Sequence, residues 1–198
     1  MIKAIIFDIG GVLVENSNVP ILQQIADQYN LDFASVQEVI FANSEQLALG
    51  GITEIEILNK LAQKFNLPET GSDIYNKVTG VYYPIDAVWE YVGQLKGRYH
   101  LAVLSNMGLD GIDTHEEQYG LAEHFEKVFY SASLGMKKPN PAFYQKLVDE
   151  LGVVAGECVF VDDMQRNVDV ATRLGMQGIL YTDPSQLKTD LLAAGVVL

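Results

Sequence analysis

The chain has 198 residues, a length that suits one domain of good size or a domain with a smaller insert. Hydrophobic residues make up 48% of it, which is enough for a large buried core and argues against disorder. The formal net charge of −13 would repel a nucleic-acid backbone or an anionic membrane surface, so neither is expected as a partner.

The first residues and the single cysteine favour a soluble, cytoplasmic protein. The apolar stretch before Asp8 is too short for the apolar region of a signal peptide, and no run of about 18 apolar residues follows it. Cys158 is the only cysteine, so an intrachain disulfide is excluded. We expect a monomer or a weak homodimer.

The first apolar run, residues 4–7, predicts a short buried strand, and a long helical region follows it. Residues 16–83 show helical periodicity without convincing strands. Within them, Thr53-Glu54-Ile55-Glu56 is a capping-box pattern that opens a helix. We therefore predict a small all-helical cap insert at 16–83, within a core made of residues 1–15 and 84–198.

The rest of the chain alternates apolar runs with helical patterns. Four more runs predict parallel strands at residues 100–104, 127–130, 158–161 and 178–181. They lack polar alternation, as expected when helices cover both faces of a sheet. Between them, Asn140 and Pro141 are typical of a helix start, and Gly152 of a helix end. The fold class predicted is α/β, an open parallel Rossmann-like sheet with helices on both faces.

Polar residues follow several of these predicted strands. They are Asp8, Ser105-Asn106, Lys137-Lys138 and Asp162-Asp163. Ligands of open α/β sheets bind beyond the carboxyl ends of the strands, so we expect these side chains to converge on one crevice. Two adjacent carboxylates repel each other unless a cation lies between them, which makes the Asp162-Asp163 pair the least ordinary of these features.

Four segments resemble, in order, the four motifs of the haloacid dehalogenase superfamily. They are residues 7–13, 104–106, 138–144 and 160–167. Each segment alone has an ordinary explanation as a turn or a helix cap, but four in order at strand ends are much harder to explain in that way. The resemblance covers essentially the whole chain, with the helical insert in the place of the family's cap. Within the superfamily, the chain is similar to small capped phosphatases, which include sugar-phosphate phosphatases and the N-terminal phosphatase domain of soluble epoxide hydrolase.

The resemblance implies a Mg²⁺-dependent phosphatase that hydrolyses a small phosphorylated metabolite through an aspartyl-phosphate. Asp8 would be the nucleophile and, with the carbonyl of Gly10, a metal ligand. Asp163 would bind the metal directly, and Asp162 would act through water. Mg²⁺ prefers such hard oxygen ligands and offsets the charge of a phosphoryl group.

The remaining motif residues would contact the phosphoryl group. By resemblance, Lys138 supplies positive charge and Ser105 a hydrogen bond to the phosphoryl oxygens. Asn106 would contact the phosphoryl group or the rest of the substrate. Asn167 would orient the aspartate pair or close the turn, a supporting role. Lys137 is expected to be dispensable.

One position departs from the family pattern. Phosphatases of the family usually carry a second aspartate two residues after the nucleophile, as general acid and base, and here that residue is Gly10. Slow turnover or a preference for good leaving groups follows, because general acid–base catalysis contributes roughly 10²- to 10⁴-fold. Glu15 is a possible substitute, although a solvated loop acid is its more ordinary reading.

Gly10 also keeps other functions open. One alternative is a catalytically weak relative that binds a phosphorylated ligand or a protein partner. A dehalogenase acting through Asp8 is disfavoured, because dehalogenases of the superfamily lack the acidic pair that this chain keeps, and a phosphomutase would need the missing acid–base residue. The substrate is not identified. Between Glu15 and Tyr83 the chain has nine acidic and three basic residues, which weakly favours a substrate with a neutral body, such as a sugar monophosphate.

Overall fold

The computed structural model describes residues 1–15, 18–78 and 83–198. Its centre is a five-stranded parallel sheet in the order β3-β2-β1-β4-β5. The strands are β1 (Ala4–Phe7), β2 (His100–Ser105), β3 (Lys127–Tyr130), β4 (Cys158–Asp162) and β5 (Gln177–Leu180). The predicted open parallel α/β sheet is therefore confirmed.

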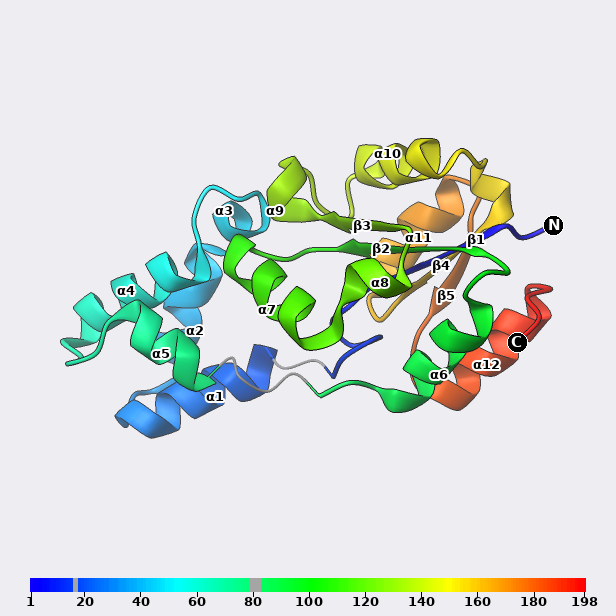
Figure 1. Cartoon of the computed structure of the whole chain (residues 1–198). Helices are drawn as coiled ribbons and strands as arrows, with labels where there is room; N and C mark the ends of the chain where they lie inside the picture. The colour runs from blue at the N-terminus through cyan, green and yellow to red at the C-terminus, as the bar shows by residue number, and fades with distance from the viewer. Residues whose placement is uncertain (16–17, 79–82) are drawn as a thin grey trace.

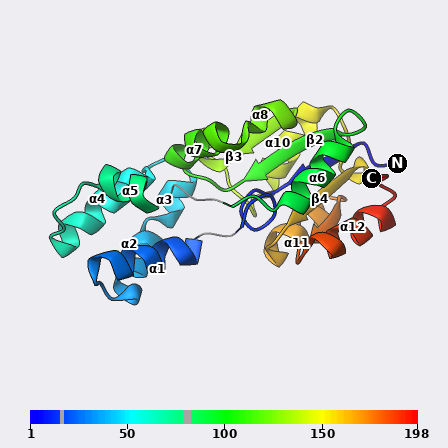
Figure 2. The same ribbon diagram turned by 60° about the horizontal axis from the view of Figure 1, so that its bottom comes forward.

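Helices cover both faces of this sheet (Figures 1 and 2). On one face lie α6 (Asp86–Leu95), α7 (Leu109–Tyr119), α8 (Leu121–His124) and α12 (Pro184–Ala193). On the other lie α9 (Ser131–Leu134), α10 (Pro141–Leu151) and α11 (Gln165–Arg173), and the 3-10 turn η1 (Ala155–Glu157) precedes β4. Successive strand residues point to opposite faces, so Ile5 and Phe7 pack into the first core and Ala4 and Ile6 into the second.

Local chemistry sets the helix ends where the sequence predicts them. The Asn140 side chain accepts a hydrogen bond from the Ala142 N–H, Pro141 is the first residue of α10, and Gly152 ends the helix with φ 68°. Two strands run one residue further than predicted. Ser105 pairs with Tyr130, and Asp162 with Leu180, so each is the last residue of its strand rather than the first residue after it.

Of the six described helices between β1 and β2 in the chain, the first five form what we call the insert. They are α1 (Asn18–Tyr29), α2 (Phe33–Ala42), α3 (Ser44–Ala48), α4 (Glu54–Phe65) and α5 (Gly71–Val78). They share an apolar core of their own, which includes Ile25, Val36 and Leu61. Figure 1 shows the insert at the end of the sheet where the strands finish.

The predicted ends of the insert are described only in part. Its predicted first residue, Asn16, lies outside the described residues. At the other end, the Tyr83 carbonyl accepts a hydrogen bond from the Glu15 N–H at 2.9 Å, so the two connections run side by side there.

The predicted capping box of α4 is present, with Thr53 and Glu56 exchanging hydrogen bonds. Among the helices that the structure describes, none is long and apolar enough to cross a membrane.

Candidate active site

Asp8 lies immediately after β1, the central strand of the sheet. Its N–H donates to the Val161 carbonyl at 2.9 Å, and its Oδ1 accepts from the Ile9 N–H at 2.7 Å. The residue before it, Phe7, is in register with Val103 on β2 and with Val161 on β4. The sheet therefore places the predicted nucleophile between the second and fourth motifs, where only 8% of the residue is exposed.

The Lys138 ammonium group bridges two of the carboxylates. Its Nζ lies 2.8 Å from Asp8 Oδ2 and 2.7 Å from Asp162 Oδ2, and the residue is buried. The backbone of Lys138 is held by Asn106, whose Oδ1 accepts from the Lys138 N–H at 2.8 Å and whose Nδ2 donates to the Lys138 carbonyl at 3.0 Å. The side chain of the second motif thus fixes the position of the lysine in the third.

Asp162 is fully buried and well supplied with donors. Besides Lys138, the Asn167 Nδ2 donates to both of its oxygens, at 2.9 and 3.1 Å, and the Met164 N–H donates to Oδ1 at 2.8 Å. Asn167 is itself held through its carbonyl, which accepts from the Tyr144 hydroxyl at 3.2 Å. The structure therefore gives Asn167 direct contact with Asp162, the first residue of the acidic pair.

Three carboxylates come close enough to share a metal ion. Asp8, Asp162 and Asp163 each offer an oxygen atom, and these atoms lie within 4.8 Å of one another. Asp163 is half-buried and packs over Gly11, which has φ +78° and where a Cβ would overlap its carboxylate. The Asn167 Oδ1 atom is buried and has no hydrogen-bond partner among the described residues. A set of hard oxygen donors with a spare acceptor beside it fits a divalent cation such as Mg²⁺.

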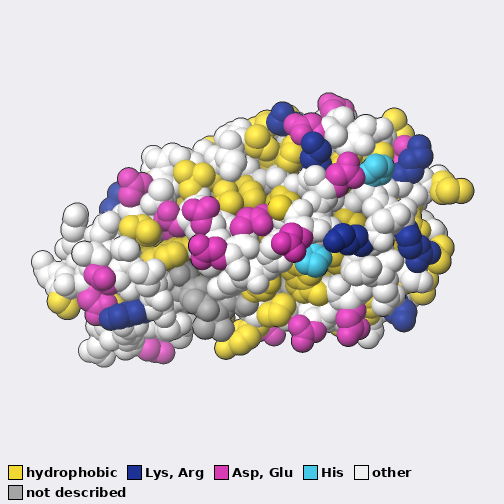
Figure 3. All heavy atoms as spheres, in the orientation of Figure 1, with side chains coloured by type: hydrophobic (Ala, Val, Ile, Leu, Met, Phe, Trp, Pro, Cys, Tyr) yellow, Lys and Arg dark blue, Asp and Glu magenta, His cyan; other side chains and the backbone are white. Residues whose placement is uncertain are grey.

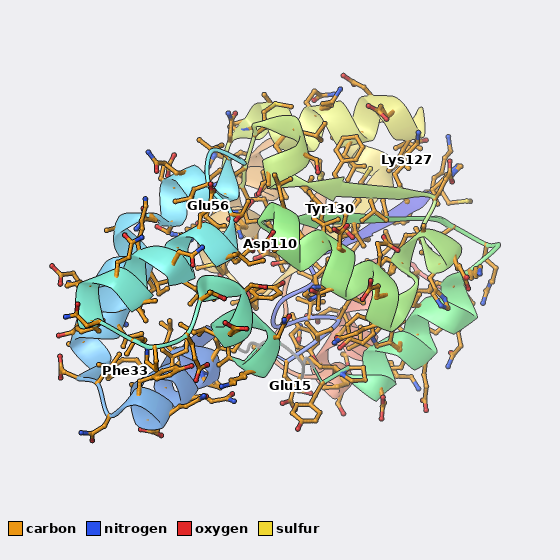
Figure 4. All side chains as sticks on the ribbon, turned by 60° about the vertical axis from the view of Figure 1, so that its left-hand side comes forward. Glu15, Phe33, Glu56, Asp110, Lys127 and Tyr130 are labelled. Atoms are coloured by element: carbon orange, nitrogen blue, oxygen red, sulfur yellow. The ribbon has the colours of Figure 1, made fainter. Side chains whose placement is uncertain are left out.

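Three other residues that the sequence singled out lie at the end of β2 or in the segment after β1. Ser105 is buried at the end of β2, the strand next to β1. A Cβ built on Gly10 meets no atom within 4 Å, so the position left by the family's second aspartate is open. Glu15, labelled in Figure 4, is an exposed residue of the segment after β1, and the structure does not bury its side chain with the other carboxylates.

Comparison with known proteins shows the family to which the chain belongs. Residues 5–181 match the family described as haloacid dehalogenase-like hydrolase. The chain belongs to this family. It is 31% identical over 186 residues to a sesquiterpene phosphatase of Aspergillus oryzae, covering 91% of this chain and 90% of that protein. It is 25% identical to a D-ribitol-5-phosphate phosphatase of Bacteroides thetaiotaomicron, covering 89% and 90%.

A solved structure shares the fold of this hydrolase. It is a haloacid dehalogenase family enzyme of Bacteroides thetaiotaomicron in complex with magnesium and inorganic phosphate. The superposition has a TM-score of 0.75 at 21% identity and covers 92% of this chain and 95% of the other. At this identity the similarity establishes the fold.

The electrostatics of the hydrolase separate the site from its surroundings. Burial raises the pKa of Asp8 to about 6; Lys138 opposes this shift and Asp162 adds to it. Burial disfavours the charge of Lys138, but Asp8 and Asp162 outweigh it and raise the pKa of the lysine, which stays charged. Acidic side chains gather on the surface over α7 (Figure 3). In the site itself three carboxylates face one ammonium group, so an anionic ligand would need a bound cation in addition to Lys138.

The sequence indicated which residues meet but missed how they are joined. Lys138 contacts both Asp8 and Asp162, and Asn106 holds the Lys138 backbone; these contacts join residues at least 24 positions apart. No local pattern encodes such pairs. The one available signal was the neighbourhood of strand ends, which predicts that residues meet without assigning their partners.

Proposed function

We propose that this hydrolase is a Mg²⁺-dependent phosphatase that cleaves a small phosphomonoester through an aspartyl-phosphate on Asp8. The observation that carries the proposal is the place of Asp8 directly after the central strand, paired with the ammonium group of Lys138 and close to the other two carboxylates of a candidate cation site. The names of the two phosphatase relatives and the magnesium and phosphate of the structural relative support it.

In the first step, an oxygen of Asp8 attacks the phosphorus atom, and the bond between phosphorus and the ester oxygen breaks. In the second step, water attacks the aspartyl-phosphate, which releases inorganic phosphate and restores the Asp8 carboxylate. Lys138 stabilises the charge on the phosphoryl oxygens, and Ser105 donates a hydrogen bond to them. Asn106 acts through the backbone of Lys138, which it holds in place.

The residues present fit the metal that this chemistry uses. Asp8 and Asp163 would hold Mg²⁺ with the Gly10 carbonyl. Asp162 accepts hydrogen bonds from Lys138, Asn167 and Met164, so it would act on the metal indirectly. When bound, Mg²⁺ supplies positive charge that offsets the repulsion between the carboxylate and the phosphate.

The core and the insert would have different functions. We assign the reaction to the core, residues 1–15 and 84–198, and the covering of the substrate to residues 16–83 as a cap. Without an acid at Gly10, cleavage depends on the leaving group itself, so substrates with weakly basic leaving oxygens, such as anomeric sugar phosphates, are favoured.

The test is hydrolysis of p-nitrophenyl phosphate with Mg²⁺ and with EDTA, together with Asp8→Asn and the exposed control Asp149→Asn. We expect metal-dependent release of p-nitrophenol, lost in Asp8→Asn and kept in Asp149→Asn. Acid quench followed by mass spectrometry should find a phosphoryl group on Asp8 in the wild type. Hydrolysis that survives EDTA, or an Asp8→Asn variant with more than a few per cent of the wild-type rate, would exclude this mechanism.

A further inference from the structure

The insert touches the core at the segment that follows the second motif, where two helices begin. Glu54 is the first residue of α4 in the insert, and Asp110 lies in the first turn of α7 in the core. The Asp110 Oδ2 accepts from the Ile55 N–H at 2.9 Å, and the Glu54 Oε2 accepts from the Asp110 N–H at 3.2 Å. Each acidic residue therefore caps the helix that carries the other.

This exchange supplies an acceptor to an N–H group at the start of each helix. The first N–H groups of a helix have no partner within the helix and carry partial positive charge. In α4, the capping box satisfies the Glu56 N–H, and Asp110 satisfies that of Ile55. In α7, the N-cap residue is Gly108, which has no side chain to offer, so the acceptor comes from the insert.

Gly108 allows the two parts to approach closely. Its φ of −75° and ψ of 169° suit any residue, so the backbone does not require glycine there. A Cβ on Gly108 would instead overlap the Glu54 carboxylate and lie 2.5 Å from Leu47 Cδ1, both in the insert. Because Gly108 has no side chain, Glu54 and Leu47 of the insert can occupy the space beside its backbone. Burial raises the pKa of Glu54, consistent with a carboxylate enclosed at this contact.

The contact continues along α7. Four residues after Asp110, on the same face of the helix, the Thr114 hydroxyl lies 3.0 Å from the Tyr75 hydroxyl of α5. Two residues before Gly108, Asn106 holds the backbone of Lys138. Figure 4 shows Asp110 at the end of α7 that faces the insert. The insert is therefore docked on the segment that leads into the phosphoryl site.

We propose that Glu54 and Asp110 are positioning residues, which hold the insert closed on the second motif by capping each other's helices. The consequence for catalysis rests on the proposed phosphatase function: the closed insert covers the body of the substrate, while the phosphoryl group is handled by the core. Substrates whose body reaches the insert depend on this contact, and substrates too small to reach it do not.

Amide hydrogen exchange tests the contact without reference to activity. In Glu54→Ala the Asp110 amide loses its acceptor, and we expect its exchange to rise about fivefold, the size of a lost helix cap. Because the two caps act together, the Ile55 amide should exchange faster as well, while the β1 amides stay unchanged. Glu54→Gln keeps an acceptor oxygen and should retain the protection. Unchanged exchange at both amides in Glu54→Ala would overturn the proposal.

Kinetics with two substrates test the consequence. Gly108→Ala inserts a Cβ between the two parts from the core side, and Gly93→Ala is its control, because a Cβ there meets no atom within 4 Å. We expect Gly108→Ala and Glu54→Ala to raise KM for p-nitrophenyl phosphate about fivefold, with acetyl phosphate and Gly93→Ala nearly unaffected. An equal loss for both substrates would overturn the positioning role. A wild type that hydrolyses neither would overturn the phosphatase proposal instead, and the exchange rates would still decide whether the two caps hold the insert.

Discussion

The Nζ atom of Lys138 lies 2.8 Å from the Oδ2 atom of Asp8, in a pair that is almost wholly removed from water. The adjacent Lys137 instead forms an ion pair with Glu45 of the insert, in which both side chains are partly exposed. We expect Lys138→Ala to lower kcat about 10²- to 10³-fold, the effect of losing one donor to a developing anion.

Lys137→Ala is the matched control for this experiment. Exposed ion pairs contribute little, so its kcat should stay within about twofold of the wild type. Steady-state rates with p-nitrophenyl phosphate, after thermal melts have shown both variants to be folded, provide the comparison. A larger loss in Lys137→Ala than in Lys138→Ala would contradict the assignment of the lysine.

Asp162 and Asp163 are adjacent in the chain, but we expect their loss to act on different properties. Asp162→Ala removes a fully buried carboxylate from Lys138 and Asn167, so it should cost about 3 kcal/mol or more of stability. Asp163→Ala, at a half-buried position, should keep the melting temperature and lose most Mg²⁺ affinity. Calorimetric Mg²⁺ titration and thermal melts of both variants separate these effects. Unchanged Mg²⁺ binding in both would leave the acidic pair a structural role alone.

Gly10 has room for the first side-chain carbon of the aspartate that the family usually carries, because a Cβ there meets no atom within 4 Å. We expect Gly10→Asp to speed the cleavage of alkyl phosphates about 10²-fold, since it restores a general acid. Gly10→Asn has the same size without the acid and should not do so. In the wild type, rapid-quench kinetics should show a burst of p-nitrophenol equal to the enzyme concentration. A wild-type rate that does not depend on the leaving group, with no burst, would indicate that another residue serves as general acid and base. Glu15 is the first residue to test for this role.

The pH dependence should report the ionisation of Asp8. Burial raises its pKa from 3.8 to about 6, and the nucleophile must be ionised, so at low Mg²⁺ the value of kcat/KM should fall as the pH drops through about 6. Metal and proton compete for the same carboxylate, so more Mg²⁺ should move this midpoint to lower pH. Profiles at two Mg²⁺ concentrations check both points. A midpoint that does not respond to Mg²⁺ would mean that a different group titrates.

The sequence by itself determined the features that depend on neighbouring residues. Asn140 and Gly152 bound a helix because capping uses atoms within one turn, and the capping box at Thr53 formed for the same reason. Apolar runs predicted the parallel strands, and the rule for parallel sheets placed Asp8, Lys138 and the acidic pair at one edge of the sheet.

Only the tertiary structure decided which of those residues touch. In the strand order, β1 lies between β2 and β4. The fold brings Lys138 to both Asp8 and Asp162, and it brings Asn106 to the Lys138 backbone. The exchange between Glu54 and Asp110 joins residues more than 50 positions apart, through two helix starts whose sequences give no sign of each other. Periodicity and capping are local properties of a chain, whereas such pairs are selected by the packing of whole elements, which bury apolar faces and leave few ways to satisfy the polar groups between them.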